Sequence, residues 1–157
     1  MTIAGIRCSS KSGIGSHDIG LQDANNFEDI FVVVRSSVKE SLGLERSGLE
    51  LYLRDLPIEI GAFHKIGTNI IVVNNTLINR VVVARVSLTE IKSFVYSVLL
   101  HECLHSLRIY DELQVRRLTC QISKKAFGER HPASILDKRG PWAILDWGSS
   151  LPGGNWS

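Results

Sequence analysis

Apolar side chains recur at helical spacing in two long stretches of the chain. Between residues 23 and 42 they fall on one face, and Gly43 then provides a natural end to the helix. Between residues 87 and 107 they cover a broader face, which is typical of a largely buried helix. The Ser87 hydroxyl is followed three residues later by the Glu90 carboxylate, and this spacing forms a capping box at the start of a helix. The pattern predicts an amphipathic helix and, later in the chain, a core helix.

A different periodicity occupies the interval between these helices. Apolar and polar residues alternate over residues 49–56, which predicts a strand that ends at Pro57. Residues 58–66 and 69–73 predict two further strands, and the second of these is rich in β-branched side chains. Residues 76–86 favour a short helix, with a strand as the alternative. The interval therefore predicts a small sheet.

The remaining segments complete a single domain. A third helix is predicted for residues 111–127, with Asp111 as its N-cap and Gly128 after its end. The chain from residue 131 onward is predicted to be irregular, and residues 1–22 are predicted to form a short strand and a Ser/Gly-rich loop. The order of the elements predicts one α+β domain that spans residues 1–157.

Composition narrows the classes of protein to which the chain can belong. The formal net charge of +2 is too small to predict a nucleic-acid partner, and we interpret the basic residues from Lys124 to Arg139 as a solvated face. No apolar run reaches membrane-spanning length, and no secretory signal is visible. Three widely spaced cysteines, Cys8, Cys103 and Cys120, form no disulfide framework and favour a reducing compartment. We expect a cytoplasmic monomer with no membrane partner.

One pentapeptide carries the strongest chemical signal in the sequence. It is His101-Glu102-Cys103-Leu104-His105, and H-E-x-x-H is the zinc-binding signature of metallopeptidase helices. Two histidines four residues apart lie on the same face of a helix, so both imidazoles can reach one metal ion. The glutamate beside the first histidine can then take a proton from water on that ion. The motif falls near the end of the predicted core helix, where unpartnered polar groups are costly, and this position also favours metal binding.

The motif and the order of the elements together resemble those of the zincin metallopeptidases. The resemblance implies a small, mostly antiparallel twisted sheet packed on an N-terminal helix and on the metal-binding helix. It also implies an edge strand that runs beside the cleft and binds an extended substrate backbone, for which residues 61–73 are the best match. One zinc ion as the cofactor, and a peptide or protein as the substrate, follow from the same resemblance.

Three residues compete to be the third protein ligand that a catalytic zinc ion takes. Asp111 is preferred, because the stretch H-E-x-x-H-x-x-R-x-x-D resembles the extended metzincin motif in its variant that ends in Asp. Arg108 stands where that motif has glycine, so the turn must be different or strained. Glu112 is the second candidate, since it resembles the glutamate that a following helix supplies in gluzincins. His131 is the third candidate, as in small zincins that take a late histidine.

The sequence therefore predicts a zinc metallopeptidase that hydrolyses peptide bonds. The expected metal ligands are His101, His105 and Asp111, and Glu102 is the expected catalytic base. The alternative is a zinc-stabilised binding or regulatory domain without turnover, which the arginine at position 108 favours. A water at the fourth coordination position would support the enzyme, and a protein side chain there would support the structural domain.

Overall fold

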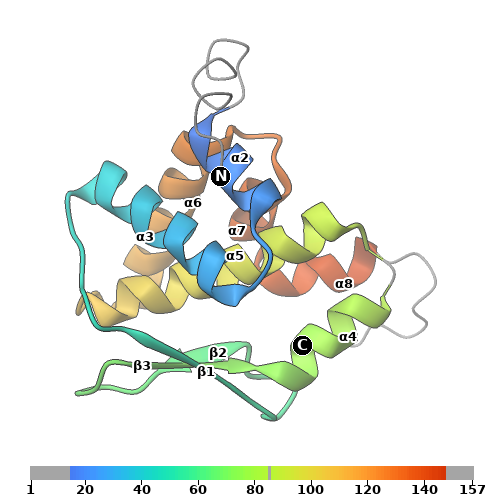
Figure 1. Cartoon of the computed structure of the whole chain (residues 1–157), viewed down its shortest axis with the longest axis horizontal. Coiled ribbons are helices and arrows are strands. Elements are labelled where there is room, and N and C mark those ends of the chain that lie inside the picture. Colours follow the sequence, from blue (N-terminus) through green and yellow to red (C-terminus); the bar gives the residue numbers. More distant parts are fainter. Residues whose placement is uncertain (1–14, 85, 148–157) are drawn as a thin grey trace.

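The computed structural model describes residues 15–84 and 86–147, in which a helical layer lies over a small sheet (Figure 1). In chain order the elements are α2 (Ser16–Asp23), α3 (Phe27–Leu42), β1 (Glu50–Arg54), β2 (Ala62–His64), β3 (Ile70–Asn74), α4 (Asn75–Val83), α5 (Leu88–Ser106), α6 (Glu112–Phe127), α7 (Pro132–Arg139), η2 (Pro141–Ala143) and α8 (Ile144–Trp147). This is the α+β class that the sequence predicts. Within the described ranges, no helix is long and apolar enough to cross a membrane.

Helix α5 is the centre of the packing. It begins with the predicted capping box, in which the Glu90 amide donates to the Ser87 hydroxyl and the Ser87 amide donates to the Glu90 carboxylate. Phe94, Leu99 and Leu100 in its middle are completely buried. The helix packs against α3, α6, α7 and β2. Because each large apolar side chain contributes about 1.5–3 kcal/mol on burial, this packing holds firmly the helix that carries both histidines.

The sheet is mixed, with the strand order β1-β3-β2. Strand β1 pairs with β3 in parallel and β2 pairs with β3 antiparallel, so the expectation of a mostly antiparallel sheet was wrong for β1. After β1 the chain crosses to the other side of β3, forms β2, and turns back at Gly67, whose φ of 82° suits glycine. Apolar alternation specifies which side of a strand faces the core, but it does not specify the direction of the neighbouring strand. The crossing decides that direction.

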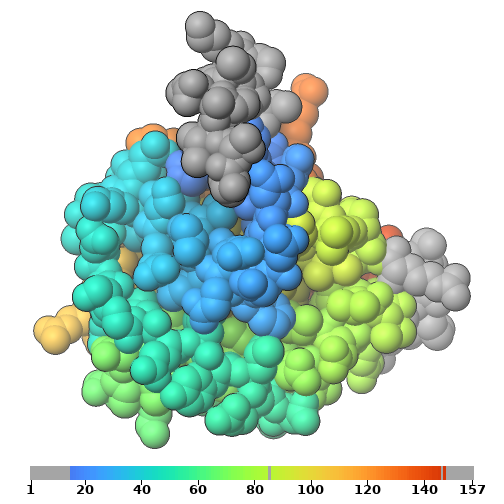
Figure 2. Space-filling model, in the orientation of Figure 1, coloured from blue at the N-terminus to red at the C-terminus, as the bar shows by residue number. Residues whose placement is uncertain are grey.

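The first predicted helix is present as α3, with the expected end at Gly43 and a later start. The helix was expected over residues 23–42, and α3 begins after Asn26. The Asn26 side chain accepts a hydrogen bond of 2.8 Å from the Asp29 amide, which caps α3. Helix α2 precedes this cap and occupies residues that were expected to form part of a loop. Figure 2 shows α2 and α3 together on the face of the molecule that Figure 1 presents.

The segment after α6 is helical where an irregular chain was expected. His131 is the N-cap of α7 and accepts from the Ala133 amide at 3.1 Å, and Pro132 occupies the first helical position. Leu136 and Ile144 are completely buried against the core. Histidine is an uncommon N-cap, and for this reason the start signal was missed.

Helix α4 confirms the helical interpretation of residues 76–86 as far as Val83, where the helix ends. The Asn74 side chain caps it by accepting hydrogen bonds from the Thr76 and Leu77 amides. The expected strand near residues 3–6 and Trp156 lie outside the described residues.

Candidate metal centre

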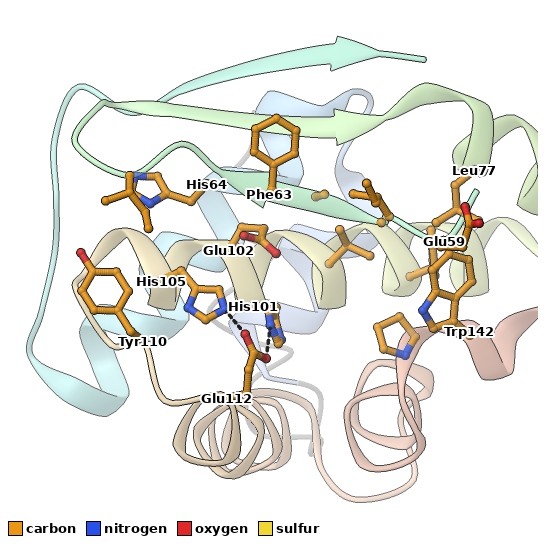
Figure 3. A pocket seen from close by; sticks show the side chains of 17 residues that line it. Glu59, Phe63, His64, Leu77, His101, Glu102, His105, Tyr110, Glu112 and Trp142 are labelled. Carbon is orange, nitrogen blue, oxygen red and sulfur yellow. Dashed lines mark ion pairs between the residues drawn. The ribbon is translucent and has the colours of Figure 1, made fainter. Parts of the chain in front are cut away.

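Three side chains converge where the last two turns of α5 meet the first turn of α6. His101 Nε2 lies 3.1 Å from one oxygen of Glu112, and His105 Nε2 lies 2.7 Å from the other. The three potential ligand atoms all lie within 4.8 Å of one another, so this set, called here the ligand group, is close enough to hold a metal ion. Figure 3 shows both imidazoles directed at the Glu112 carboxylate.

The turn between α5 and α6 brings Glu112 to the histidines. The Ile109 amide donates to the Leu104 carbonyl and the Arg108 amide donates to the His105 carbonyl, which is the pair of bonds of a Schellman motif. Arg108 occupies the left-handed position with φ of 70°, where glycine is usual. Of the two alternatives that Arg108 left open, a different turn or a strained one, the structure has the strained turn.

The same turn orients His105. Its Nδ1 lies 2.9 Å from the Ile109 carbonyl oxygen, which can only accept, so Nδ1 donates. In the neutral ring Nε2 then carries a lone pair, and this lone pair faces a carboxylate oxygen. Two acceptors at such a distance need a proton or a cation between them. A backbone carbonyl that fixes the tautomer in this way is the usual outer partner of a metal-ligating histidine.

The donor set fits a metal ion. Burial lowers the pKa of His101, and the nearby Glu112 carboxylate acts in the opposite direction. A partly buried imidazole therefore resists protonation and retains its lone pair for a metal ion. Two ligand atoms bound tetrahedrally to zinc at about 2.1 Å lie roughly 3.4 Å apart, a spacing within the 4.8 Å that bounds the ligand group.

The structure places Asp111 and His131 elsewhere. The Asp111 carboxylate caps α6 by accepting from the Leu113 amide at 3.1 Å. His131 lies 3.2 Å from the Asp18 carboxylate and stacks on the Phe127 ring, with the ring centroids 4.5 Å apart. Of the three candidates for the third ligand, only Glu112 lies beside the two histidines. The backbone of α6 engages the Asp111 carboxylate at the N-cap, whereas the carboxylate of the next residue, Glu112, faces the two histidines.

Glu102 lies between α5 and the sheet, beside the ligand group (Figure 3). It is 8% exposed, and this burial raises the pKa of its carboxyl to about 8. The backbone amide of His64 acts in the opposite direction, whereas the charge of Glu112 adds to the rise. A cation held by the ligand group would favour the ionised form of Glu102.

An open cleft of about 670 Å³ gives access to the ligand group and to Glu102. It runs between α5 and the edge strand β2, and Tyr110 lies beside His105 at one end (Figure 3). The other end, beyond His101, is mostly apolar; it is lined by Leu77, Phe94, Val98, Pro141 and Trp142. Pro141 and Trp142 reach the cleft because the chain turns after α7, which no local sequence pattern specifies.

The cleft edge of β2 presents backbone groups that β3 does not bind, and one of these, the His64 amide, faces the Glu102 carboxyl. Gly61 and Lys65 make backbone hydrogen bonds to β3 on either side of the strand's centre. Bonded and non-bonded residues alternate along an antiparallel strand, so the backbone groups of Ala62 and His64 point away from β3. This edge can pair with an extended chain laid along the cleft.

Comparison with protein-family models, with curated proteins and with solved structures finds no significant match to this chain. What the protein does must therefore be inferred from the chemistry of the cleft.

Proposed function

We propose that the protein is a zinc-dependent metallopeptidase of the zincin type. The observation that supports this most strongly is the convergence of His101, His105 and Glu112 beside the buried Glu102 in an open cleft. Two imidazoles and one carboxylate are a ligand set of catalytic zinc sites, which keep a fourth position for water or substrate. The cleft leaves room for such a fourth ligand.

The edge of β2 supports a peptide as the substrate. The backbone groups of Ala62 and the carbonyl of His64, which β3 does not bind, match an extended chain, which would pass beside Glu102 and the ligand group. The apolar end of the cleft would then accept a large side chain of that peptide, because its lining offers few polar partners.

Glu102 is proposed to move the proton. When bound, a zinc ion lowers the pKa of a water molecule and polarises the carbonyl of the scissile bond. Glu102 accepts the proton as the water oxygen attacks the carbonyl carbon, and it donates that proton to the amine nitrogen as the C–N bond breaks. Its burial favours the protonated form and therefore keeps the proton available for the leaving amine.

Peptidase activity of the Glu102→Gln variant tests this proposal. Zinc-loaded wild-type protein is expected to hydrolyse members of a quenched fluorescent peptide library, to lose activity with a chelator and to regain it with zinc. Glu102→Gln is expected to keep one equivalent of zinc and to lower kcat by roughly 10²–10⁴-fold, the usual contribution of a general base. Glu28→Gln, at an exposed carboxylate on α3, is the matched control and should retain activity.

Two results would contradict the proposal. Wild-type activity in Glu102→Gln would exclude the role of Glu102 as the base. A wild-type protein that cleaves no library peptide, but unfolds when zinc is removed, would support the zinc-stabilised non-catalytic domain.

A further inference from the structure

A second cavity, of about 330 Å³, adjoins the cleft between α5, α6 and the turn after α7. It shares His101, Glu112, Pro141 and Trp142 with the cleft. A group bound in this cavity would therefore lie next to the ligand group, on the side of His101. Figure 3 shows Trp142 beyond His101, at the end of the cleft opposite Tyr110.

Two arginines line this second cavity. Arg116 lies one helical turn after Glu112 on α6, and Arg139 is the last residue of α7. Both are exposed, and neither guanidinium group forms an ion pair with a described residue. Arg116 lies close enough to His101 to lower the pKa of its imidazole, so its charge acts within the site.

The carboxylates of the same cavity are directed elsewhere. Asp137 accepts hydrogen bonds from the hydroxyls of Ser97 and Ser123, one on each oxygen. Glu112 faces the two histidines. A divalent ion in the ligand group would offset the charges of Glu112 and Asp137. The two guanidinium groups would then give the cavity an excess of positive charge.

We infer that this second cavity binds a carboxylate group of the peptide ligand through Arg116 and Arg139. The inference rests on the proposed function in one respect, since it takes the ligand to be a peptide. A guanidinium group presents paired N–H donors that match the two oxygens of a carboxylate, and such charge-assisted bonds are stronger than neutral ones. An acidic side chain and a free C-terminus both supply this group.

Peptide binding to zinc-loaded Glu102→Gln protein tests the inference without turnover. The probes are hexapeptides, acetylated and amidated, in which one Glu or one Gln occupies each position in turn, together with the Gln peptides carrying a free C-terminal carboxylate. We expect one charged peptide to bind about tenfold more tightly than its neutral counterpart, as measured by calorimetry. A preference for an internal Glu assigns the site to an acidic side chain, and a preference for the free terminus assigns it to the C-terminal carboxylate.

Neighbouring cations supply the matched controls. In the Glu102→Gln protein, Arg116→Gln and Arg139→Gln should each remove most of the preference for the charged peptide. Arg117→Gln and Lys138→Gln alter exposed side chains that do not line the cavity. These two variants should retain the preference for the charged peptide. All four sites are exposed, so circular dichroism should show an unchanged fold. Equal affinity for charged and neutral peptides, no binding of any probe, or a preference that survives in both cavity variants overturns the inference.

The failure of this inference is distinguishable from failure of the proposed function. An arginine-dependent preference in a protein that hydrolyses no peptide would support the carboxylate site and contradict the peptidase function. Peptide hydrolysis without any charge preference would support the peptidase function and contradict the carboxylate site.

Discussion

Replacing Asp137 with Asn is expected to change how the stability of the protein depends on pH. Asp137 is 7% exposed on α7, and burial raises the pKa of its carboxyl to about 7, although hydrogen bonds from Ser123 and Ser97 partly offset the rise. Its reference pKa is 3.8. Between these values the folded protein binds more protons than the unfolded chain. The stabilising contribution of protonated Asp137 is therefore complete below pH 3.8 and is lost as the pH rises toward 7.

The size of the effect follows from linkage. A difference of one bound proton changes the free energy of unfolding by about 1.4 kcal/mol per pH unit. Because titration of the folded protein reduces this slope close to pH 7, the wild-type protein should lose about 2 kcal/mol between pH 5 and pH 7 through this group alone. Asparagine has a similar shape, keeps an oxygen acceptor for one hydroxyl and does not titrate, so Asp137→Asn should not show this loss.

Urea unfolding followed by circular dichroism at pH 5, 6 and 7 measures this difference. The free energy of unfolding of Asp137→Asn, minus that of the wild type at the same pH and zinc content, should rise by about 2 kcal/mol from pH 5 to pH 7. Subtraction at each pH removes the contributions of all other groups that titrate alike in the two proteins. A difference that stays constant across the range would refute the assignment of Asp137 as a buried, readily protonated carboxyl.

Two further predictions concern the turn and the third ligand. Arg108→Gly should raise the free energy of unfolding by about 0.5–1 kcal/mol because glycine adopts the left-handed conformation without strain, whereas Arg108→Ala should give no such gain in urea titrations. Asp111→Ala should cost about 1 kcal/mol through loss of the α6 cap while zinc affinity is preserved. Glu112→Ala should weaken zinc binding by more than about 100-fold in a chelator competition, since loss of even an outer partner costs 10–100-fold. The opposite pattern in these last two variants would make Asp111 the ligand.

The core helix and its histidine pair could be predicted because their signals lie within a few residues. The capping box at Ser87 sets the start of α5, and helical periodicity then places His101 and His105 on one face. Strands could be predicted for the same reason, because alternation and β-branched runs are local patterns, although β2 covers only Ala62–His64 of the strand expected over residues 58–66. Residues 76–86, which include most of α4, had stayed open between helix and strand. The start of α3 shows the limit of this reasoning, because the Asn26 cap places it four residues after the start expected from the sequence.

The third ligand could not be predicted from local patterns, because it depends on the path of the chain between two helices. The left-handed conformation of Arg108 determines that path. A glycine would have indicated such a conformation in the sequence, whereas an arginine does not. Two adjacent carboxylates then compete, and the backbone engages Asp111 while Glu112 reaches the histidines. The direction of β1 and the position of Trp142 likewise depend on long-range packing.

Anomalous diffraction at the zinc edge, from a crystal of the zinc-loaded protein, tests the central claim most directly. The account predicts one strong peak at about 2.0–2.2 Å from His101 Nε2, His105 Nε2 and a Glu112 oxygen, with the Asp111 carboxylate still capping α6. No peak at this position, or a peak ligated by Asp111 in place of Glu112, would contradict it.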